Sequence, residues 1–141
     1  MKCAELMKKD VECSRSGDSV QSVAQKMRDR NIGFMPVCND KGVAIGTVTD
    51  RDLTLRVLAD KRSADTRVED VMSRDVVSCG PEDELTSAEE LMSKHKKSRM
   101  LVADDKGCPL GVISLSDIAK AERGGRASAI LRSVAQRESH T

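Results

Sequence analysis

The sequence predicts an α/β (α+β) protein in which one β-α-β-β-α unit is made twice. The first observation is a repeat, because residues 3–58 shifted by 65 positions fall without a gap onto residues 68–123. The second is patterning, because each copy contains short apolar runs and stretches of helical spacing. A period this long does not suit a solenoid and is typical of a supersecondary module made twice. We therefore expect functional residues at positions that recur in both copies.

Composition limits both the core and the partners. The 141 residues include one Phe and no Trp or Tyr, so the core of one domain or of two half-domains must be aliphatic. The 24 basic and 23 acidic residues give a net charge of +1, which argues against general attraction to nucleic acid or to an anionic membrane. No apolar run approaches the roughly 20 residues of a membrane span, and residues 1–10 are too polar for a signal peptide. A cytoplasmic protein is the simplest expectation.

The cysteines and histidines do not indicate a metal site or an active site. The five cysteines are scattered and form no C-x-x-C pair, so reduced thiols in small core gaps are expected. His95 falls on a predicted helix three residues after Met92, where a half-buried structural histidine is expected. No pair of a nucleophile and a base recurs in the two copies, so we do not expect an enzyme.

Each copy opens with a short strand and an amphipathic helix. In the first copy the strand is expected at residues 11–13, and Asp18 is expected to cap the helix. In the second copy the strand is expected at residues 76–78, and residues 81–83 form the helix entry. The apolar helix faces follow an α-helical period; they are Val20, Val23, Ala24 and Met27, and then Leu85, Ala88, Leu91, Met92 and His95.

A hairpin and a second helix complete each copy. Phe34–Cys38 contains Pro36, so it is expected to be an edge or irregular strand. A turn at residues 39–42 leads to a partner strand over Ala44–Val48. The inner face of the next helix is expected to carry Leu53, Val57 and Leu58. The second copy repeats these elements with strands at Arg99–Ala103 and Leu110–Ile113 around a turn at residues 104–107, followed by Leu115, Ile118 and Ala119 on the last helix.

These elements define three regions. The first repeat is predicted at residues 1–62 and the second at residues 63–123, with a polar connector over residues 59–66. Residues 124–141 lie outside the repeat, where Ala127, Ile130, Leu131 and Val134 indicate an amphipathic helix before a polar tail. This helix is a candidate packing or partner surface.

One motif recurs where the last strand of each copy meets the last helix. It reads Gly46-Thr-Val-Thr49-Asp-Arg-Asp52 in the first copy and Gly111-Val-Ile-Ser114-Leu-Ser-Asp117 in the second. The structural interpretation is a capping box, with a hydroxyl at the N-cap and an acid three residues later. The functional interpretation is a ribose phosphate site, because Gly permits close approach, a helix N-terminus attracts phosphate, and a carboxylate accepts from two vicinal hydroxyls. The sequence leaves both open.

The duplicated unit, the two junction motifs and the run Met35-Pro36-Val37 resemble a tandem pair of CBS domains, named after cystathionine β-synthase. The resemblance covers residues 3–123, and Arg99–Asp117 is most similar to the nucleotide-binding repeats of the γ subunit of AMP-activated protein kinase. Such a pair is called a Bateman module. The resemblance implies two repeats packed about a pseudo-twofold, with clefts between them that bind an adenosine-containing ligand. The expected ligand is an adenine nucleotide (AMP, ADP or ATP), with S-adenosylmethionine or NAD as alternatives.

The resemblance also implies residue roles. Carboxylates are expected on the ribose, hydroxyls and arginines on phosphate or ribose, and apolar residues beside the adenine. The ribose candidates are Asp52 and Asp117. The candidates for phosphate or ribose are Thr49, Ser114, Ser116, Arg51 and Arg99. The candidates beside the adenine are Val11, Val76, Met35 and Met100. Phe34 replaces Arg99 in the first copy, so the two sites need not bind equally.

Two functions are compatible with these features. A stand-alone regulatory module would bind nucleotide and signal to an unknown protein partner, which requires different affinities for two arrangements of the module. A ligand-free structural or interaction module would keep the fold and the helix caps alone. A homodimer is also expected, because the apolar helix surfaces of so small a chain are not all buried within it.

Overall fold

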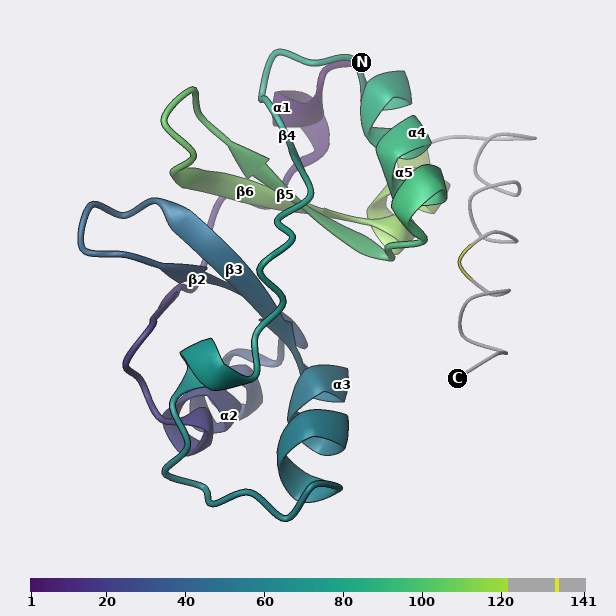
Figure 1. Cartoon of the computed structure of the whole chain (residues 1–141). Coiled ribbons are helices and arrows are strands. Elements are labelled where there is room, and N and C mark those ends of the chain that lie inside the picture. Colours follow the sequence, from purple (N-terminus) through teal and green to yellow (C-terminus); the bar gives the residue numbers. More distant parts are fainter. Residues whose placement is uncertain (122–133, 135–141) are drawn as a thin grey trace. The chain divides into compact units, whose positions relative to one another are not determined.

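The computed structural model describes residues 1–121 and Val134, which fall into two compact units (Figure 1). The first-repeat unit comprises Val11–Val76 with Lys106–Pro109. The second-repeat unit comprises Met1–Asp10, Val77–Asp105 and, of the described residues that follow, 110–121 and Val134. The leading segment of the chain therefore belongs to the unit that contains the second repeat.

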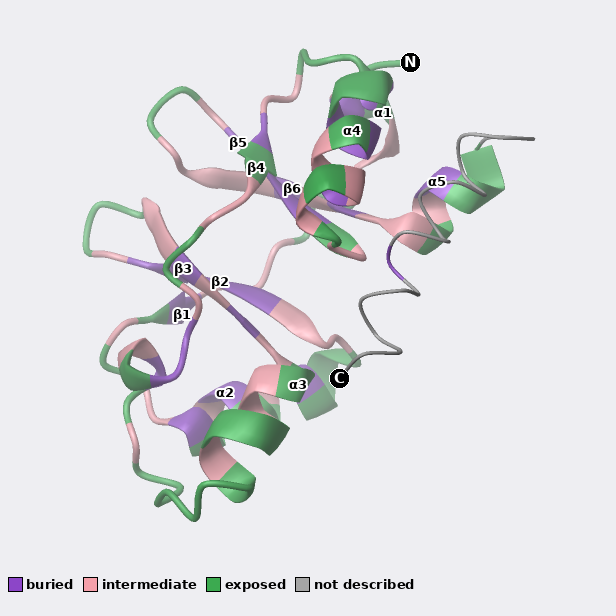
Figure 2. Ribbon diagram, turned by 45° about the vertical axis from the view of Figure 1, so that its right-hand side comes forward, coloured by how far each residue is buried: buried purple, intermediate pink, exposed green. Residues whose placement is uncertain are grey.

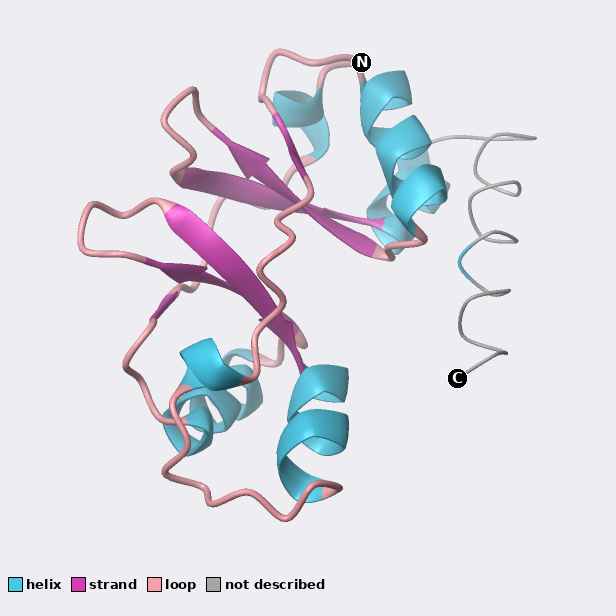
Figure 3. Cartoon of the chain, viewed as in Figure 1, coloured by secondary structure: helices cyan, strands magenta, loops and turns pink. Residues whose placement is uncertain are grey.

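The first-repeat unit is built on a three-stranded sheet in the order β1-β2-β3 (Figure 3). Strand β1 (Ser14–Arg15) is parallel to β2 (Phe34–Cys38), and β2 is antiparallel to β3 (Ala44–Thr49). The remaining elements are α2 (Val20–Arg30), the short helix α3 (Asp50–Leu53), a π-helical turn η1 (Thr54–Leu58) and a 3₁₀ turn η2 (Val68–Asp70).

The second-repeat unit has the same order of elements on a sheet β4-β5-β6. Strand β4 (Ser78–Cys79) is parallel to β5 (Arg99–Ala103), which is followed by β6 (Pro109–Ser114). Helix α4 (Leu85–His95) connects β4 to β5, and α5 (Leu115–Ala121) follows β6. The amino-terminal helix α1 (Cys3–Leu6) is also part of this unit. The predicted α+β class with two β-α-β-β-α repeats is confirmed.

The first strand of each copy begins later than expected. Strand β1 starts at Ser14 rather than at residue 11, and β4 starts at Ser78 rather than at residue 76. The parallel pairing begins only where Ser14 meets Val37 and Ser78 meets Leu101. The preceding residues are those where the chain passes from one compact unit to the other, and this passage leaves them outside the ladder.

The predicted helix cap Asp18 is wrong by one residue. Ser19 is the N-cap of α2, and its Oγ accepts from the backbone N–H of Ser22 at 3.1 Å. The Asp18 carboxylate instead accepts from the N–H of Arg15 at 2.9 Å and closes the preceding turn. In the second copy Asp83 accepts from the N–H of Gly80 in the same way, at 2.8 Å, and α4 begins two residues later.

Strand β2 lies in the middle of its sheet, so the expected edge position is wrong. Proline is tolerated there because β1 pairs only with Val37 and Cys38, and no bond to β1 requires a donor at Pro36. The expected irregularity is present, since the pairing of β2 with β3 shifts between Val37 and Cys38.

Each unit has its own aliphatic core, visible as the buried inner faces in Figure 2. In the first-repeat unit the core joins Val23 and Met27 of α2 to the strands, while Ala24, predicted to share that face, is exposed. In the second-repeat unit it joins Ala88 and Met92 of α4 to the strands. Val134 is also buried in this core, and the other residues of the predicted C-terminal helix lie outside the described part of the chain.

The thiols are free, and three of them fill core positions as expected. Cys3, Cys38 and Cys79 are buried, and the sulfur atoms of Cys3 and Cys79 lie 3.5 Å apart. Burial raises the pKa of Cys38 to about 12 and also raises the pKa of Cys79. These thiols are therefore protonated at neutral pH, as expected for packing residues.

The helix after β3 does not bury the face that was predicted. Leu53 and Val57 are partly buried, but Leu58 is 77% exposed and Leu55 is 47% exposed. The helix changes from α to π geometry after Leu53, as shown by the bond from Ala59 N to Thr54 O at 2.9 Å. The wider turn leaves Leu58 off the inner face.

Candidate functional site

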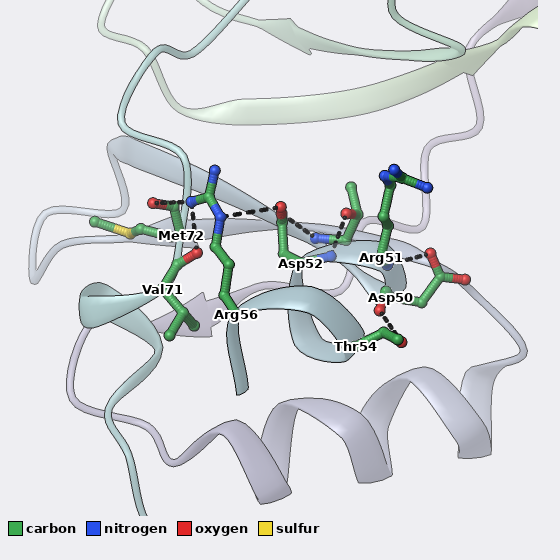
Figure 4. Close-up of polar contacts among 8 residues, drawn as sticks. Asp50, Arg51, Asp52, Thr54, Arg56, Val71 and Met72 are labelled. Carbon is green, nitrogen blue, oxygen red and sulfur yellow. Dashed lines mark hydrogen bonds and ion pairs between the residues drawn. The ribbon is translucent and has the colours of Figure 1, made fainter. Parts of the chain in front are cut away.

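The junction of the first repeat is a complete capping box (Figure 4). The backbone N–H of Thr49 donates to Oδ2 of Asp52 at 2.9 Å, and the N–H of Asp52 donates to Oγ1 of Thr49 at 3.1 Å. These bonds satisfy backbone donors that would otherwise lack partners at the helix start. The structural interpretation of the motif is therefore confirmed here.

The junction of the second repeat has the same geometry. The N–H of Ser114 donates to Oδ2 of Asp117 at 3.2 Å, and the N–H of Asp117 donates to Oγ of Ser114 at 3.1 Å. The hydroxyl of Ser116 lies 2.9 Å from that of Ser114. Oδ1 of Asp117 has no hydrogen-bond or ion-pair partner among residues 1–121.

The two junction glycines do not make room for a ligand. A Cβ at Gly111 would lie 2.6 Å from Sδ of Met7 and 2.9 Å from the carbonyl oxygen of Lys8. A Cβ at Gly46 would likewise collide with Met72 and with the backbone of the residue that follows it. The close approach that these glycines permit is made by the Met7 and Met72 segments. The prediction that they make room for a ligand is therefore wrong.

The segments that cover the glycines act as short additional edge strands. Lys8 forms two backbone bonds with Val112 of β6, at 2.9 and 3.0 Å, and Ser73 forms two with Thr47 of β3, both at 2.9 Å. The repeat relates these segments, because Met7 matches Met72. The conservation of that pair between the copies was the signal that could have revealed this packing.

Arg56 is the site residue that the sequence analysis missed. Its Nη1 donates to the carbonyl oxygens of Val71 and Met72 at 3.0 and 3.4 Å, and its Nε lies 3.8 Å from Oδ1 of Asp52 (Figure 4). An i,i+4 acid and base pair on a helix was a signal that could have found it. Arg56 was not considered because the search favoured positions that recur in both copies, and the matching residue in the second copy is Ala121.

The two predicted phosphate-binding arginines lie beside different junctions. Arg51 is exposed in the first turn of α3, and Arg99 is exposed at the start of β5. The bond from Leu115 N to Ser98 O, at 2.8 Å, holds the start of β5 against the Ser114 junction. Neither guanidinium has a partner among the described residues. The backbone at the start of β5, next to Arg99, is adjacent to the junction that contains Ser114 and Asp117.

The four predicted adenine-contacting residues fall into two groups, two in the cores and two that are half-buried. Met35 and Met100 are core residues with 0% and 1% of their surface exposed, and Sδ of Met35 accepts from the buried hydroxyl of Ser14 at 2.8 Å. A base could reach these two side chains only if the core opened, so the structure does not bring them to the site. Val11 and Val76 are half-buried, and both belong to the first-repeat unit.

A family comparison identifies the repeats. The model of the CBS domain matches residues 3–59 and again residues 68–124. The chain belongs to the CBS-domain family. The CBS domain-containing protein YhcV of Bacillus subtilis is 34% identical over 115 residues, which are 82% of this chain and 81% of YhcV.

Some relatives of this CBS pair are parts of enzymes. The homoserine O-acetyltransferase of Methanohalophilus mahii is 33% identical over 114 residues, which cover 81% of this chain but only 23% of that protein. The CBS region is thus a minor part of a relative named as an enzyme. Among the residues that the structure describes here, no group of three or more acidic, Cys or His side chains could hold a metal ion.

Solved CBS proteins have the same fold. The CBS domain pair of protein MJ0100, in complex with 5′-methylthioadenosine and S-adenosyl-L-methionine, aligns with a TM-score of 0.79 and 22% identity over 86% of this chain and 94% of that one. CBSX2 in complex with AMP aligns with a TM-score of 0.72 and 21% identity over 85% of this chain and 94% of that one. These identities establish the fold alone.

The chemistry available at the CBS junctions is hydrogen bonding and charge. The second-repeat junction combines a carboxylate with two hydroxyls, and an exposed arginine, Arg99, begins the adjacent strand β5. Such groups can hydrogen-bond a sugar and attract a phosphate.

The described part of the chain has no helix with the length and hydropathy needed to cross a membrane.

Proposed function

We propose that this CBS pair is a regulatory module that binds an adenosine-containing nucleotide of the AMP, ADP or ATP class and signals to a protein partner. The observation that carries the proposal is the second-repeat junction, where Oδ1 of Asp117 has no partner within residues 1–121 and the hydroxyls of Ser114 and Ser116 lie together. A ribose diol can donate to Oδ1 while Oδ2 continues to cap α5. Arg99 supplies positive charge for phosphate.

The ligands of structurally similar proteins support this choice of chemical class. MJ0100 and CBSX2 were solved with 5′-methylthioadenosine, S-adenosyl-L-methionine or AMP, and these compounds share adenosine. A site that grips the adenosine ribose would accept several of them, so the terminal group remains to be found by experiment. S-adenosylmethionine and NAD are therefore tested together with the adenine nucleotides.

A thermal-shift panel tests binding. Purified protein is heated with AMP, ADP, ATP, S-adenosylmethionine or NAD, with GMP as the control for the base. A ligand at 100 times its dissociation constant adds about 2.7 kcal/mol to the free energy of unfolding, so the melting temperature should rise by several degrees. If no adenosine compound raises the melting temperature, the proposal is wrong.

The capping boxes favour one second candidate, a ligand-free interaction module. In that case Asp52 and Asp117 serve only the helices, and replacing either one lowers stability without changing any affinity. Titration calorimetry of the Asp117→Ala variant separates the two functions. Loss of a charge-assisted bond should weaken nucleotide binding roughly 10- to 100-fold, whereas an unchanged affinity supports the interaction module.

We also propose that two chains form a homodimer. The exposed leucines of the helix after β3, Leu55 and Leu58, form an apolar surface that a twofold pair would bury on both subunits. The cytoplasmic location and the protein partner remain predictions from the sequence.

A further inference from the structure

The arginines of the two junctions lie on different elements. The first repeat has Arg51 and Arg56 on the helix side and Phe34 at the start of the strand. The second has Arg99 at the start of the strand, and its helix side carries Ser116 and Ala121 at the matching positions. The capping boxes themselves are alike, so the two sites differ in these arginines and in two further charges at matching positions, Asp50 against Leu115 and Leu55 against Lys120.

Arg56 forms an ion pair with Oδ1 of Asp52, the carboxylate oxygen that a ribose would need. Oδ2 of Asp52 accepts the capping bond from Thr49, and Oδ1 faces Nε of Arg56 at 3.8 Å. The Asp52 side chain is only 19% exposed. A diol would have to displace the guanidinium or share a carboxylate whose charge is already partly neutralised, and both weaken a charge-assisted bond.

Arg56 is also held in place from its other side. Its Nη1 donates to two successive carbonyl oxygens, those of Val71 and Met72. Met72 in turn packs on Gly46 of β3, so the accepting backbone is fixed against the sheet. The guanidinium is therefore positioned by two carbonyl acceptors and an ion pair, and moving it would leave two carbonyl groups without this donor.

The second junction has no equivalent of this arginine. The residue four positions after Asp117 is Ala121, which cannot form an ion pair. Oδ1 of Asp117 accordingly has no partner within the described chain, and the arginine of this junction, Arg99, lies at the start of the adjacent strand β5. The same backbone motif thus presents a carboxylate without a described partner in one repeat and a carboxylate paired with an arginine in the other.

We propose that Arg56 closes the first-repeat junction to ribose, so that the adenosine ligand binds through Asp117 at the second-repeat junction alone. This inference rests on the proposed function, since it assigns the ligand of that function to one of two similar sites. Arg56 is a specificity-determining residue that acts through Asp52 and does not itself contact the ligand.

A reciprocal exchange tests the assignment by titration calorimetry with AMP. Wild type should bind a single AMP per chain, and Asp117→Ala should weaken that binding roughly 10- to 100-fold, while Asp52→Ala leaves it intact. Arg56→Ala should create a second AMP site per chain. Conversely, Ala121→Arg places a guanidinium four residues after Asp117 and should weaken AMP roughly 10-fold. Ala121→Gln, similar in length but uncharged, is the matched control and should leave the affinity unchanged.

The outcomes separate this inference from the function on which it rests. If wild type binds none of AMP, ADP, ATP, S-adenosylmethionine or NAD, the proposed function fails and the inference fails with it. If wild type binds AMP but Asp52→Ala weakens it as much as Asp117→Ala, the inference alone is overturned. A folded Arg56→Ala variant with one site also overturns it. Should that variant not fold, equal AMP affinities of Ala121→Arg and Ala121→Gln would overturn it instead.

Discussion

At the scale of single residues, the junction glycines show how a repeated residue can mislead. A recurring Gly beside a possible phosphate site suggests room for a ligand, but Gly46 and Gly111 accommodate the Met72 and Met7 segments. The repeat correctly identified the two glycine positions, but it did not reveal which part of the chain packs against them. The occupant depends on tertiary packing between residues far apart in sequence, which local patterns do not encode.

We predict that Gly46→Ala and Gly111→Ala destabilise the protein. The new Cβ would meet a backbone carbonyl, at 2.8 Å from Ser73 O or 2.9 Å from Lys8 O, and backbone cannot rotate away as a side chain can. Overpacking of this kind costs about 1–3 kcal/mol, measurable by urea unfolding. The matched control is Gly17→Ala, whose Cβ would meet nothing within 4 Å. Equal midpoints for all three variants would contradict the packing argument.

At the scale of elements, most helices and strands were predictable because their apolar residues repeat with clear periods. The strands Phe34–Cys38 and Arg99–Ala103 were predicted to the residue. The failures occur where tertiary context decides, as with Pro36 in a central strand beside the very short β1. The π-helical turn over Thr54–Leu58 was equally invisible, since its residues also fit an ordinary α-helix.

The candidate site was only partly predictable for a related reason. The pairs Thr49 and Asp52, and Ser114 and Asp117, were found because motif and repeat coincide, and their capping geometry agrees with the sequence. Arg56 was missed because it occurs in one copy only. Met35 and Met100 were included although apolar residues in central strands are ordinarily core.

We predict that two neighbouring serines of the second junction differ in their contribution to stability. Ser114→Ala removes the oxygen that accepts from the N–H of Asp117 and should cost about 0.5–2 kcal/mol. Ser116→Ala removes a hydroxyl that bonds only to Ser114 among the described residues, and should cost less than half as much. Chemical denaturation of the two variants makes the comparison. A larger loss for Ser116→Ala would show that the capping box is not what stabilises this junction.

At the scale of the whole molecule, the exposed leucines concern assembly. Leu58 and Leu55 lie on the same helical turn, next to a junction whose residues are otherwise polar. Single exposed apolar residues are common, but two on one short helix form a patch that contact with another chain would remove from water.

We predict that Leu58→Glu shifts the protein from dimer to monomer. A carboxylate placed at the centre of a twofold contact is repeated on both chains, so the charges would be buried close to each other. Sedimentation velocity at micromolar concentration measures the change. The matched control is Gln25→Glu, an equal charge at an exposed position of α2. Wild type that sediments only as a monomer, with or without AMP, would contradict the dimer.

The edge segments have a consequence for how the chain is synthesised. Met7 and Lys8 are made early, but their partner Val112 leaves the ribosome roughly 100 residues later, which at about 5–20 residues per second is several seconds or more. The first-repeat sheet obtains its own edge segment, Ser73, much sooner. Residues 11–76 can therefore become ordered during translation while Met7 and Lys8 still lack strand β6, so a nascent chain halted before Pro109 would leave Met7 and Lys8 open to proteases and chaperones.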